Sequence, residues 1–377
     1  MSKSDNRSPN GFLAAVRKVY HTLHFDKGYN FIFCKFHSLY ARFSFADRQI
    51  DFIFAGGLLG FILARLQYLD IDGVFCKFKS ANGAAPGECY WYAMSLYGVG
   101  IRLHLGCILP AALLAIFQFT PVIRHKVTLY HRMAGYVTIM LVLCSNAGAL
   151  IIAPHAFGGS LATQAGVGLL VLVSTVGIAL AVYNIRCMQI DQHRKWMLRV
   201  WFYMGSIVTL RLVLLAGAAI TSKRPGSHYQ ATACPEIVSI FGGTPGAYHF
   251  YPACEASPNS YALVQANSNG NPAEVGAALD TVFPMAMWLA LFMHMVGVEL
   301  YIMLTPREHE RLRRVSYERQ MARGYLNPGS AGLVPEMIGD MDKWAPPAKD
   351  RADSPVQNIA EAHPLMPLGS DPKAVWT

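Results

Sequence analysis

The sequence predicts an all-α, polytopic membrane helical bundle with about six transmembrane helices. Hydrophobic residues make up 53% of the 377 residues and only 15% are charged, which is too apolar for an ordinary soluble domain. Several segments also reach the length of about 20 mainly apolar residues that a helix needs to cross a hydrocarbon core of roughly 30 Å. A lipid bilayer is therefore the expected surroundings of this chain.

The predicted spans divide the chain into three parts. A basic, amphipathic and cytosolic segment is expected at 1–50, a six-span domain at 51–305, and a cytosolic, largely disordered tail at 306–377, with a short helix possible at REHERLRRVSYERQMA. The exterior loops are 69–97 and 221–280, and a loop as long as the second is unusual unless it is functional or held by a disulfide. The six spans are 52–68, 98–120, 131–153, 165–185, 196–220 and 281–304.

The distribution of basic residues predicts the orientation. Lys and Arg gather before the first span, between spans two and three, between spans four and five, and after the last span, whereas the opposite loops hold only Lys77, Lys79, Lys223 and Arg224. Because cytosolic segments carry this excess, both termini are expected in the cytosol. The net charge of +9 mostly reflects the same bias, so no nucleic-acid partner is expected. The membrane is predicted to be the plasma membrane or part of the endomembrane system.

The cysteines agree with this topology. Cys76 and Cys89 both fall in the first exterior loop, and Cys234 and Cys254 both fall in the loop 221–280. Thiols on the exterior or lumenal side meet an oxidising environment, so two loop disulfides are predicted. The other cysteines include Cys107 and Cys144, which lie within spans and are interpreted as small apolar residues.

Ionisable side chains inside spans are costly and mark candidate functional positions. His193 and Arg211 are 18 residues apart, about five turns of a helix with roughly 3.6 residues per turn, so they share one face, which is expected to point into the bundle. Span four has almost no polar side chains and is expected to face lipid. The candidate residues are His131 and His193 near the cytosolic face, Arg102, His104 and Arg211 toward the exterior, and His294 near the middle of the last span.

One chemistry that suits these residues is haem ligation. Two imidazoles on different helices can bind iron from opposite sides while arginines neutralise the propionates. His131 and His193 would be the iron ligands of an inner haem b, since they open two spans from the same side. An outer haem would use His104 with His155 or His294, with Arg102 and Arg211 beside the propionates. The corresponding function is a transmembrane electron carrier or redox partner.

Two alternatives use the same residues without haem. The imidazoles could hold copper or another transition metal, although the spans offer few carboxylate or thiolate ligands. They could also form a polar His/Arg network with no cofactor, in a transporter, a sensor or a structural membrane component, where Arg102, His104 and Arg211 line a pocket for an anionic or polar small molecule. In that case the His-Arg pairs at His131 and His193 are interfacial charge, and His294 is a hydrogen-bonded packing residue. No feature of the sequence identifies an enzymatic reaction.

Five stretches of the chain stand out in combination. They are GYNF (28–31), LHLGCILPAALLAIFQFTPVIRHK (103–126), HRMAGY (131–136), NAGALIIAPHAFGG (146–159) and YNIRCMQIDQHRKWMLRVWFYMGSIVTLR (183–211). These motifs resemble an uncharacterised family of predicted multi-pass membrane proteins found in bacteria and fungi. The similarity covers about residues 28–225, and the family more often has a basic residue at the position of Pro154.

The resemblance implies a multi-pass membrane fold and no settled activity. It marks as motif positions His104, Gln118, His131, Arg132, Gly135, His193, Arg194, Trp196, Met197, Arg199 and Arg211. A helical bundle with histidines near both faces is also similar, at the level of the fold, to cytochrome b-type proteins.

Overall fold

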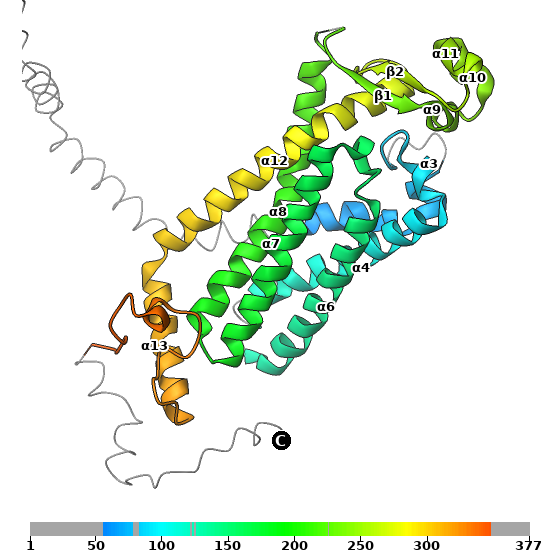
Figure 1. Cartoon of the computed structure of the whole chain (residues 1–377). Helices are drawn as coiled ribbons and strands as arrows, with labels where there is room; N and C mark the ends of the chain where they lie inside the picture. The colour runs from blue at the N-terminus through cyan, green and yellow to red at the C-terminus, as the bar shows by residue number, and fades with distance from the viewer. Residues whose placement is uncertain (1–55, 78–82, 121–122, 124–125, 225, 348–377) are drawn as a thin grey trace, which may run out of the picture. The chain divides into compact units, whose positions relative to one another are not determined.

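A computed structural model describes residues 56–77, 83–120, 123, 126–224 and 226–347 (Figure 1). Its contacts divide the chain into residues 1–61 and residues 62–377. The long helices all belong to the second unit. The predicted cytosolic segment 1–50 lies outside the described residues.

Five helices are long and apolar enough to cross a membrane, and they confirm five of the predicted spans. They are α4 (Ser95–Phe119), α6 (Thr128–Ile152), α7 (Leu161–Arg186), α8 (Ile190–Thr221) and α12 (Pro272–Leu304). Even the 25 residues of α4 rise about 37 Å, more than the roughly 30 Å of a hydrocarbon core. Of the sixth predicted span, 52–68, the structure describes a shorter apolar helix, Gly56–Leu69, and residues 52–55 lie outside the described part.

The helices pack largely in chain order. Helix α4 packs on α6, α6 on α7, α7 on α8, and α8 on α12, which also contacts α7. One buried cluster contains Ala111, Val142, Ile178 and Val200, one residue from each of α4, α6, α7 and α8. The chain therefore forms an all-α polytopic bundle.

Helix α7 exposes Leu172 (59%) and Val176 (45%), as expected for a span that faces lipid, and it also packs against α6, α8 and α12. Asn146 on α6 donates hydrogen bonds to Ser174 Oγ at 3.0 Å and to Thr175 Oγ1 at 3.1 Å. A Cβ added at Gly177 would lie 2.6 Å from Val200 Cγ2 on α8. Small residues let neighbouring helices approach closely, and hydropathy does not reveal this packing.

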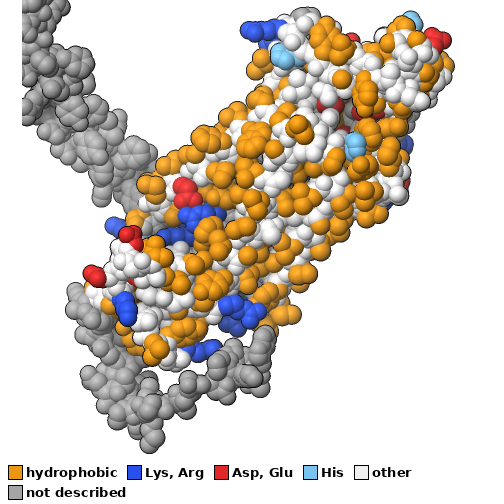
Figure 2. Space-filling view, viewed as in Figure 1, with side chains coloured by type: hydrophobic (Ala, Val, Ile, Leu, Met, Phe, Trp, Pro, Cys, Tyr) orange, Lys and Arg blue, Asp and Glu red, His pale blue; other side chains and the backbone are white. Residues whose placement is uncertain are grey.

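The surface of these helices is apolar in the way that a bilayer requires. Large hydrophobic side chains are exposed along the bundle, among them Leu161 (82% exposed) and Met303 (73%), and Figure 2 shows hydrophobic side chains spread over the helices. Exposed apolar surface on this scale marks a lipid or protein contact. The protein is therefore a multi-pass membrane protein.

The predicted loop 221–280 is folded. Strand β1 (Tyr229–Ala233) pairs antiparallel with β2 (Tyr261–Gln265), and three short helices lie between them: α9 (Cys234–Phe241), α10 (Thr244–Phe250) and α11 (Pro252–Ala256). Helix α12 begins nine residues before the predicted span, where the Asn271 side chain accepts hydrogen bonds from the backbone N–H groups of Ala273 and Glu274, an N-cap that satisfies two orphan donors.

Both predicted disulfides are present. Cys234 and Cys254 are fully buried and bonded to each other, in a small core with Ile237 and Val264. Cys76 is bonded to Cys89 at the second position of α3 (Glu88–Tyr92). Helix α3, the sheet and α9 to α11 lie at the same end of the bundle (Figure 1), here called the disulfide end.

The opposite end carries α13 (Pro306–Ala322), the helix predicted as a possibility, followed by ordered chain to residue 347. This differs from the largely disordered tail that composition predicts, while residues 348–377 lie outside the described part. The segment is held by buried amides. Gln320 Nε2 donates to Gln189 Oε1 at 2.9 Å and to the Cys187 carbonyl at 3.0 Å, and the backbone N–H of Leu333 donates to Asn184 Oδ1 at 2.8 Å. A polar segment orders here because these groups need partners.

The segment DQHRKWMLR, predicted to precede span five, forms the first turns of α8. Asp191 is 1% exposed, and it accepts hydrogen bonds from Gln189 Nε2 at 2.8 Å and from Ser316 Oγ of α13 at 3.1 Å. Helix α13 therefore completes the environment of this carboxylate.

Candidate functional site

The predicted histidines face different helices. His294 on α12 uses both ring nitrogens within the protein: Nδ1 lies 2.7 Å from the Phe202 carbonyl oxygen and Nε2 lies 2.8 Å from Thr209 Oγ1. With Nδ1 donating to the carbonyl, Nε2 accepts from the threonine hydroxyl. These contacts make His294 a hydrogen-bonded packing residue between α12 and α8, and they leave no ring nitrogen for iron.

His104 and His193 each have one ring nitrogen in a backbone contact. His104 Nδ1 lies 3.1 Å from the Ser145 carbonyl oxygen and 3.0 Å from Ser145 Oγ on α6, and His193 Nδ1 lies 2.9 Å from the Ala181 carbonyl oxygen on α7. His131 and His193 are each the fourth residue of their helices, which begin at Thr128 and Ile190. The helix bounds therefore agree with the similar depth expected for this pair.

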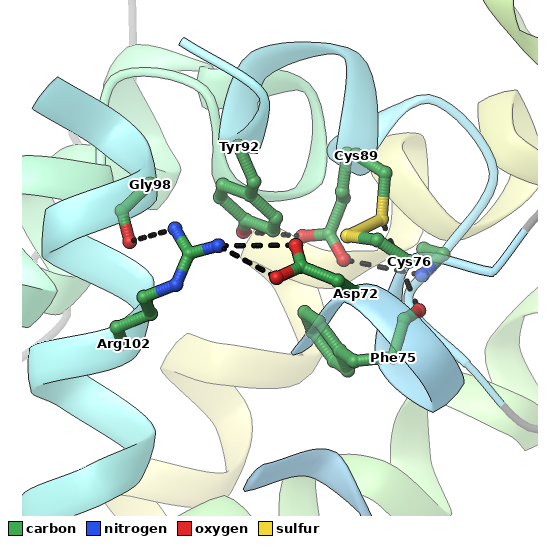
Figure 3. The surroundings of a disulfide bond; sticks show 9 residues. Asp72, Phe75, Cys76, Cys89, Tyr92, Gly98 and Arg102 are labelled. Atoms are coloured by element: carbon green, nitrogen blue, oxygen red, sulfur yellow. Dashed lines mark hydrogen bonds and ion pairs between the residues drawn. A yellow bond between two sulfur atoms is a disulfide. The ribbon is translucent and has the colours of Figure 1, made fainter. Parts of the chain in front are cut away.

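Arg102 lies on the surface and not in the interior where the outer-haem hypothesis puts it. Its Nη2 donates to both carboxylate oxygens of Asp72 at 3.0 and 3.2 Å, and its Nη1 donates to the Gly98 carbonyl at 3.3 Å (Figure 3). The side chains are 50% and 85% exposed. An exposed ion pair of this kind contributes about 0–1 kcal/mol. Arg102 therefore fixes the chain beside the Cys76–Cys89 disulfide.

Arg211 does point into the protein, as its helix face predicts. Its guanidinium carbon lies 5.1 Å from the centre of the Phe157 ring, and Glu88 is the principal opposite charge near it. Phe157 lies in the turn η3 (Ala156–Gly159) with a positive φ of 48° and stacks on Phe283 of α12 at a centroid distance of 4.0 Å. A cation over an aromatic face is stabilised by the ring quadrupole.

Glu88 is the buried carboxylate that balances Arg211. It is 6% exposed. Its Oε1 accepts hydrogen bonds from Tyr92 Oη at 3.1 Å and from the Phe157 N–H at 3.3 Å, and its Oε2 accepts from the Ala85 N–H at 3.1 Å. Burial raises the pKa of Glu88, and the Arg211 charge and these donors oppose that rise. Burial also raises the pKa of Tyr92 well above its ordinary value.

Glu236 of α9 adds a second carboxyl group. Its Oε2 accepts a hydrogen bond from Trp91 Nε1 at 3.1 Å, and the Trp91 ring stacks on His155 with centroids 3.7 Å apart. Burial raises the pKa of Glu236 to about 7, and the Glu88 charge acts in the same direction. Burial lowers the pKa of His155. Glu236 therefore titrates near neutral pH.

Asp280 completes the group from α12. Its side chain is 8% exposed, and the negative charges of Glu88 and Glu236 act on it. Its carboxyl group accepts no hydrogen bond from the described residues. The turn at Gly158, where φ is +72°, passes so close that an added Cβ would lie 3.0 Å from Asp280 Cβ. We call Glu88, Glu236, Asp280 and Arg211 the acid site.

Sequence reasoning found Arg211 and missed the three carboxyl groups. Glu88 and Glu236 fall in segments predicted to be exterior loops, and Asp280 falls one residue before the predicted start of span six. The sequence did contain a signal for the position of Asp280. The helical pattern of span six continues backward to Pro272 and the Asn271 N-cap, so Asp280 lies inside that helix and not in the loop before it. Glu88 and Glu236 had none, because tertiary contacts bury them.

The fold and this site define a multi-pass membrane helical bundle with a buried ionic cluster at one end. Residues 101–238 match the model of a family described as "Predicted membrane protein (DUF2306)", in agreement with the family resemblance of the motifs. That range includes His104, His131, His193, Arg211 and Glu236. The chain is also similar to "Ava biosynthesis cluster protein G" of Aspergillus versicolor, with 24% identity over 303 residues, which are 66% of this chain and 86% of the relative. No solved structure matches the chain.

Proposed function

We propose that this protein belongs to the cofactor-free class of membrane transporters or sensors, and that its acid site exchanges protons. The observation that carries the proposal is Asp280, a buried carboxyl group that accepts no hydrogen bond from the described residues and that is influenced by the charges of Glu88 and Glu236. Such a group is too costly to keep charged without compensation, so it carries a proton or gains a cation. Buried acids in membrane helices serve in this way in proton relays.

Glu236 and Arg211 supply the rest of a proton-exchange site. Glu236 changes charge near neutral pH, and Arg211 remains charged and stabilises Glu88 when that carboxyl group has lost its proton. The aromatic contacts of Trp91 and Phe157 connect the protonation state to the packing of α3 and η3. A change of charge at this site would therefore move elements at the disulfide end, as a transporter or sensor requires.

The similarity to a biosynthesis cluster protein leads us to propose a small molecule of a biosynthetic pathway as the substrate or signal. The proposed surroundings are the plasma membrane or an endomembrane, with the acid site on the exterior or lumenal side.

The test is the infrared carbonyl band of protonated carboxylic acids in the purified protein at neutral pH. Asp280→Asn is expected to remove one carboxylic acid from this band. Glu274→Gln is the matched control: it lies on the same helix, where its carboxylate accepts a hydrogen bond from Asn267 Nδ2 at 3.2 Å, and its substitution should leave the band unchanged. If the band is the same in wild type and in Asp280→Asn, the proposal is wrong.

A second candidate function is a narrower version of the haem hypothesis, in which His131 and His193 ligate a single inner haem b. It is favoured by one observation: a metal-binding imidazole is usually oriented by a hydrogen bond from its second nitrogen, and His193 Nδ1 has such a contact at the Ala181 carbonyl. His294 and Arg102 do not fit a haem site. The described ranges contain no group of three or more His, Cys, Asp or Glu side chains that could bind a copper ion. A Soret band in protein expressed with haem, lost in His193→Ala, would support the haem, and a spectrum without that band would reject it.

A further inference from the structure

The crossing of α4 and α6 brings two free cysteines together. The helices run antiparallel with their backbones in contact: a Cβ added at Gly148 would lie 2.7 Å from both the Gly100 carbonyl oxygen and the His104 nitrogen. His104 also contacts Ser145. From the contact of Gly148 with His104, one helical turn leads to Cys144 on α6 and to Cys107 on α4, at the same level of the two helices. Figure 1 shows the two helices side by side.

The two thiols are close neighbours. Cys144 is the ionisable side chain that acts on Cys107, and both thiols are free and half-buried. The close backbone approach matters because a disulfide requires Cα atoms roughly 4.4–6.8 Å apart and side chains directed toward each other. Small residues at the crossing are what allow that approach.

The pair lies at the surface of the bundle within the apolar length of the spans. Cys144 follows Val137 (49% exposed) and Met140 (61%) along one helix face, at spacings of three and four residues. Cys107 is the thirteenth of the 25 residues of α4, about midway along it. Within the described chain, these thiols are therefore presented to the hydrocarbon phase and not to water.

We propose that Cys107 and Cys144 are a reversible dithiol–disulfide couple that reacts with a lipid-soluble quinone. In the oxidation, both S–H bonds break and one S–S bond forms. The two electrons and two protons pass to the quinone, which becomes the quinol. Thiolates are disfavoured in apolar surroundings, so protons leave together with the electrons, and a charged, water-soluble disulfide reagent does not partition to this depth.

The test uses the full-length protein in lipid nanodiscs, reduced and freed of reductant, with a short-chain ubiquinone added. Free thiols are then alkylated and assigned by mass spectrometry. The expected result is loss of alkylation at Cys107 and Cys144 together, formation of one quinol for each disulfide, and full recovery of both thiols after reduction. Cys187, a free cysteine at the end of α7, is the internal control and should stay alkylated.

Matched variants separate the couple from other thiol chemistry. Cys107→Ser and Cys144→Ser should each abolish quinol formation and leave the partner thiol free, while Cys187→Ser should change neither result. Ser replaces the sulfur with a group of similar size, so the fold is expected to be retained, and loop disulfides Cys76–Cys89 and Cys234–Cys254 report on it. The proposal is overturned if both thiols remain alkylated after quinone treatment, or if quinol forms equally in the single variants.

Discussion

Glu236→Gln is expected to remove a titration that makes the protein less stable as the pH rises. The pKa of Glu236 is raised from 4.5 to about 7 by burial. Between these values the folded protein holds a proton that the unfolded chain has released. The stabilisation is therefore fully present below about pH 4.5 and is lost as the pH rises through about 7.

The magnitude follows from the pKa difference. A difference of about 2.5, from 4.5 to about 7, corresponds to about 3 kcal/mol at about 1.4 kcal/mol for each unit of pKa. This is an upper limit, because Glu236 is only partly buried and solvent screens part of the interaction. A neutral glutamine keeps an oxygen that accepts the hydrogen bond from Trp91 Nε1. Glu236→Gln should thus be within about 1 kcal/mol of wild type at pH 5 and clearly more stable at pH 8.

The assay is thermal unfolding in detergent, followed by tryptophan fluorescence from pH 5 to pH 8. Wild type should lose several degrees of Tm over this range relative to Glu236→Gln, at roughly 2–4 °C for each kcal/mol in a domain of 150–250 residues. Emission from Trp91, which contacts Glu236 directly, should shift with the same midpoint. Parallel pH dependence in the two proteins would refute the assignment of the titration to Glu236.

The remaining predictions concern the ionic pair, a disulfide, α13 and the orientation. Arg211→Met removes the principal positive charge near buried Glu88 and should lower the free energy of unfolding by about 1–3 kcal/mol. Adding Glu88→Gln should recover part of the loss, and equal Tm values in the single and double variants would contradict this interaction. Cys254→Ser opens a loop of 20 residues and should cost about 3 kcal/mol, seen as a lower Tm and a smaller further loss on reduction, because only Cys76–Cys89 then remains to be reduced. Gln320→Ala removes donors to Gln189 and Cys187 and should speed amide hydrogen exchange throughout α13, whereas exposed Glu318→Ala should not. Tags at Asn6, Gly270 and Thr377 should report cytosol, exterior and cytosol, and exterior labelling at either terminus would reverse the orientation.

Composition and periodicity predicted the bundle because crossing a bilayer is a local requirement. Each span must satisfy its backbone N–H and C=O groups within its own helix and must present about 20 apolar residues. The sequence therefore predicted all of α4, α6, α7, α8 and α12. Element boundaries were less accurate where a helix leaves the membrane. The start of α12 at Pro272 and of α8 at Ile190 depends on contacts with the folded loop and with α13, which hydropathy does not register.

The sequence also identified the residues whose burial is unusual but not how they are paired. Arg211 was expected to need an interior partner or a water-filled cavity, and the principal opposite charge near it, Glu88, comes from α3, 123 positions earlier in the chain. Arg102 was assigned to the same interior and instead pairs with Asp72 on the surface. An apolar stretch on one helix does not specify which neighbour supplies the counter-charge.

The sequence by itself determined that this chain crosses a membrane several times, that Cys76 and Cys89 and Cys234 and Cys254 form two disulfides, and that Arg211 points inward. Each of these follows from local composition, spacing or helix phase. Only the tertiary structure decided that Glu88 lies near Arg211, Glu236 and Asp280, that His294 is occupied by hydrogen bonds, and that Cys107 is a neighbour of Cys144. Those groups lie on separate elements, and their chemistry depends on the burial and neighbours that packing creates.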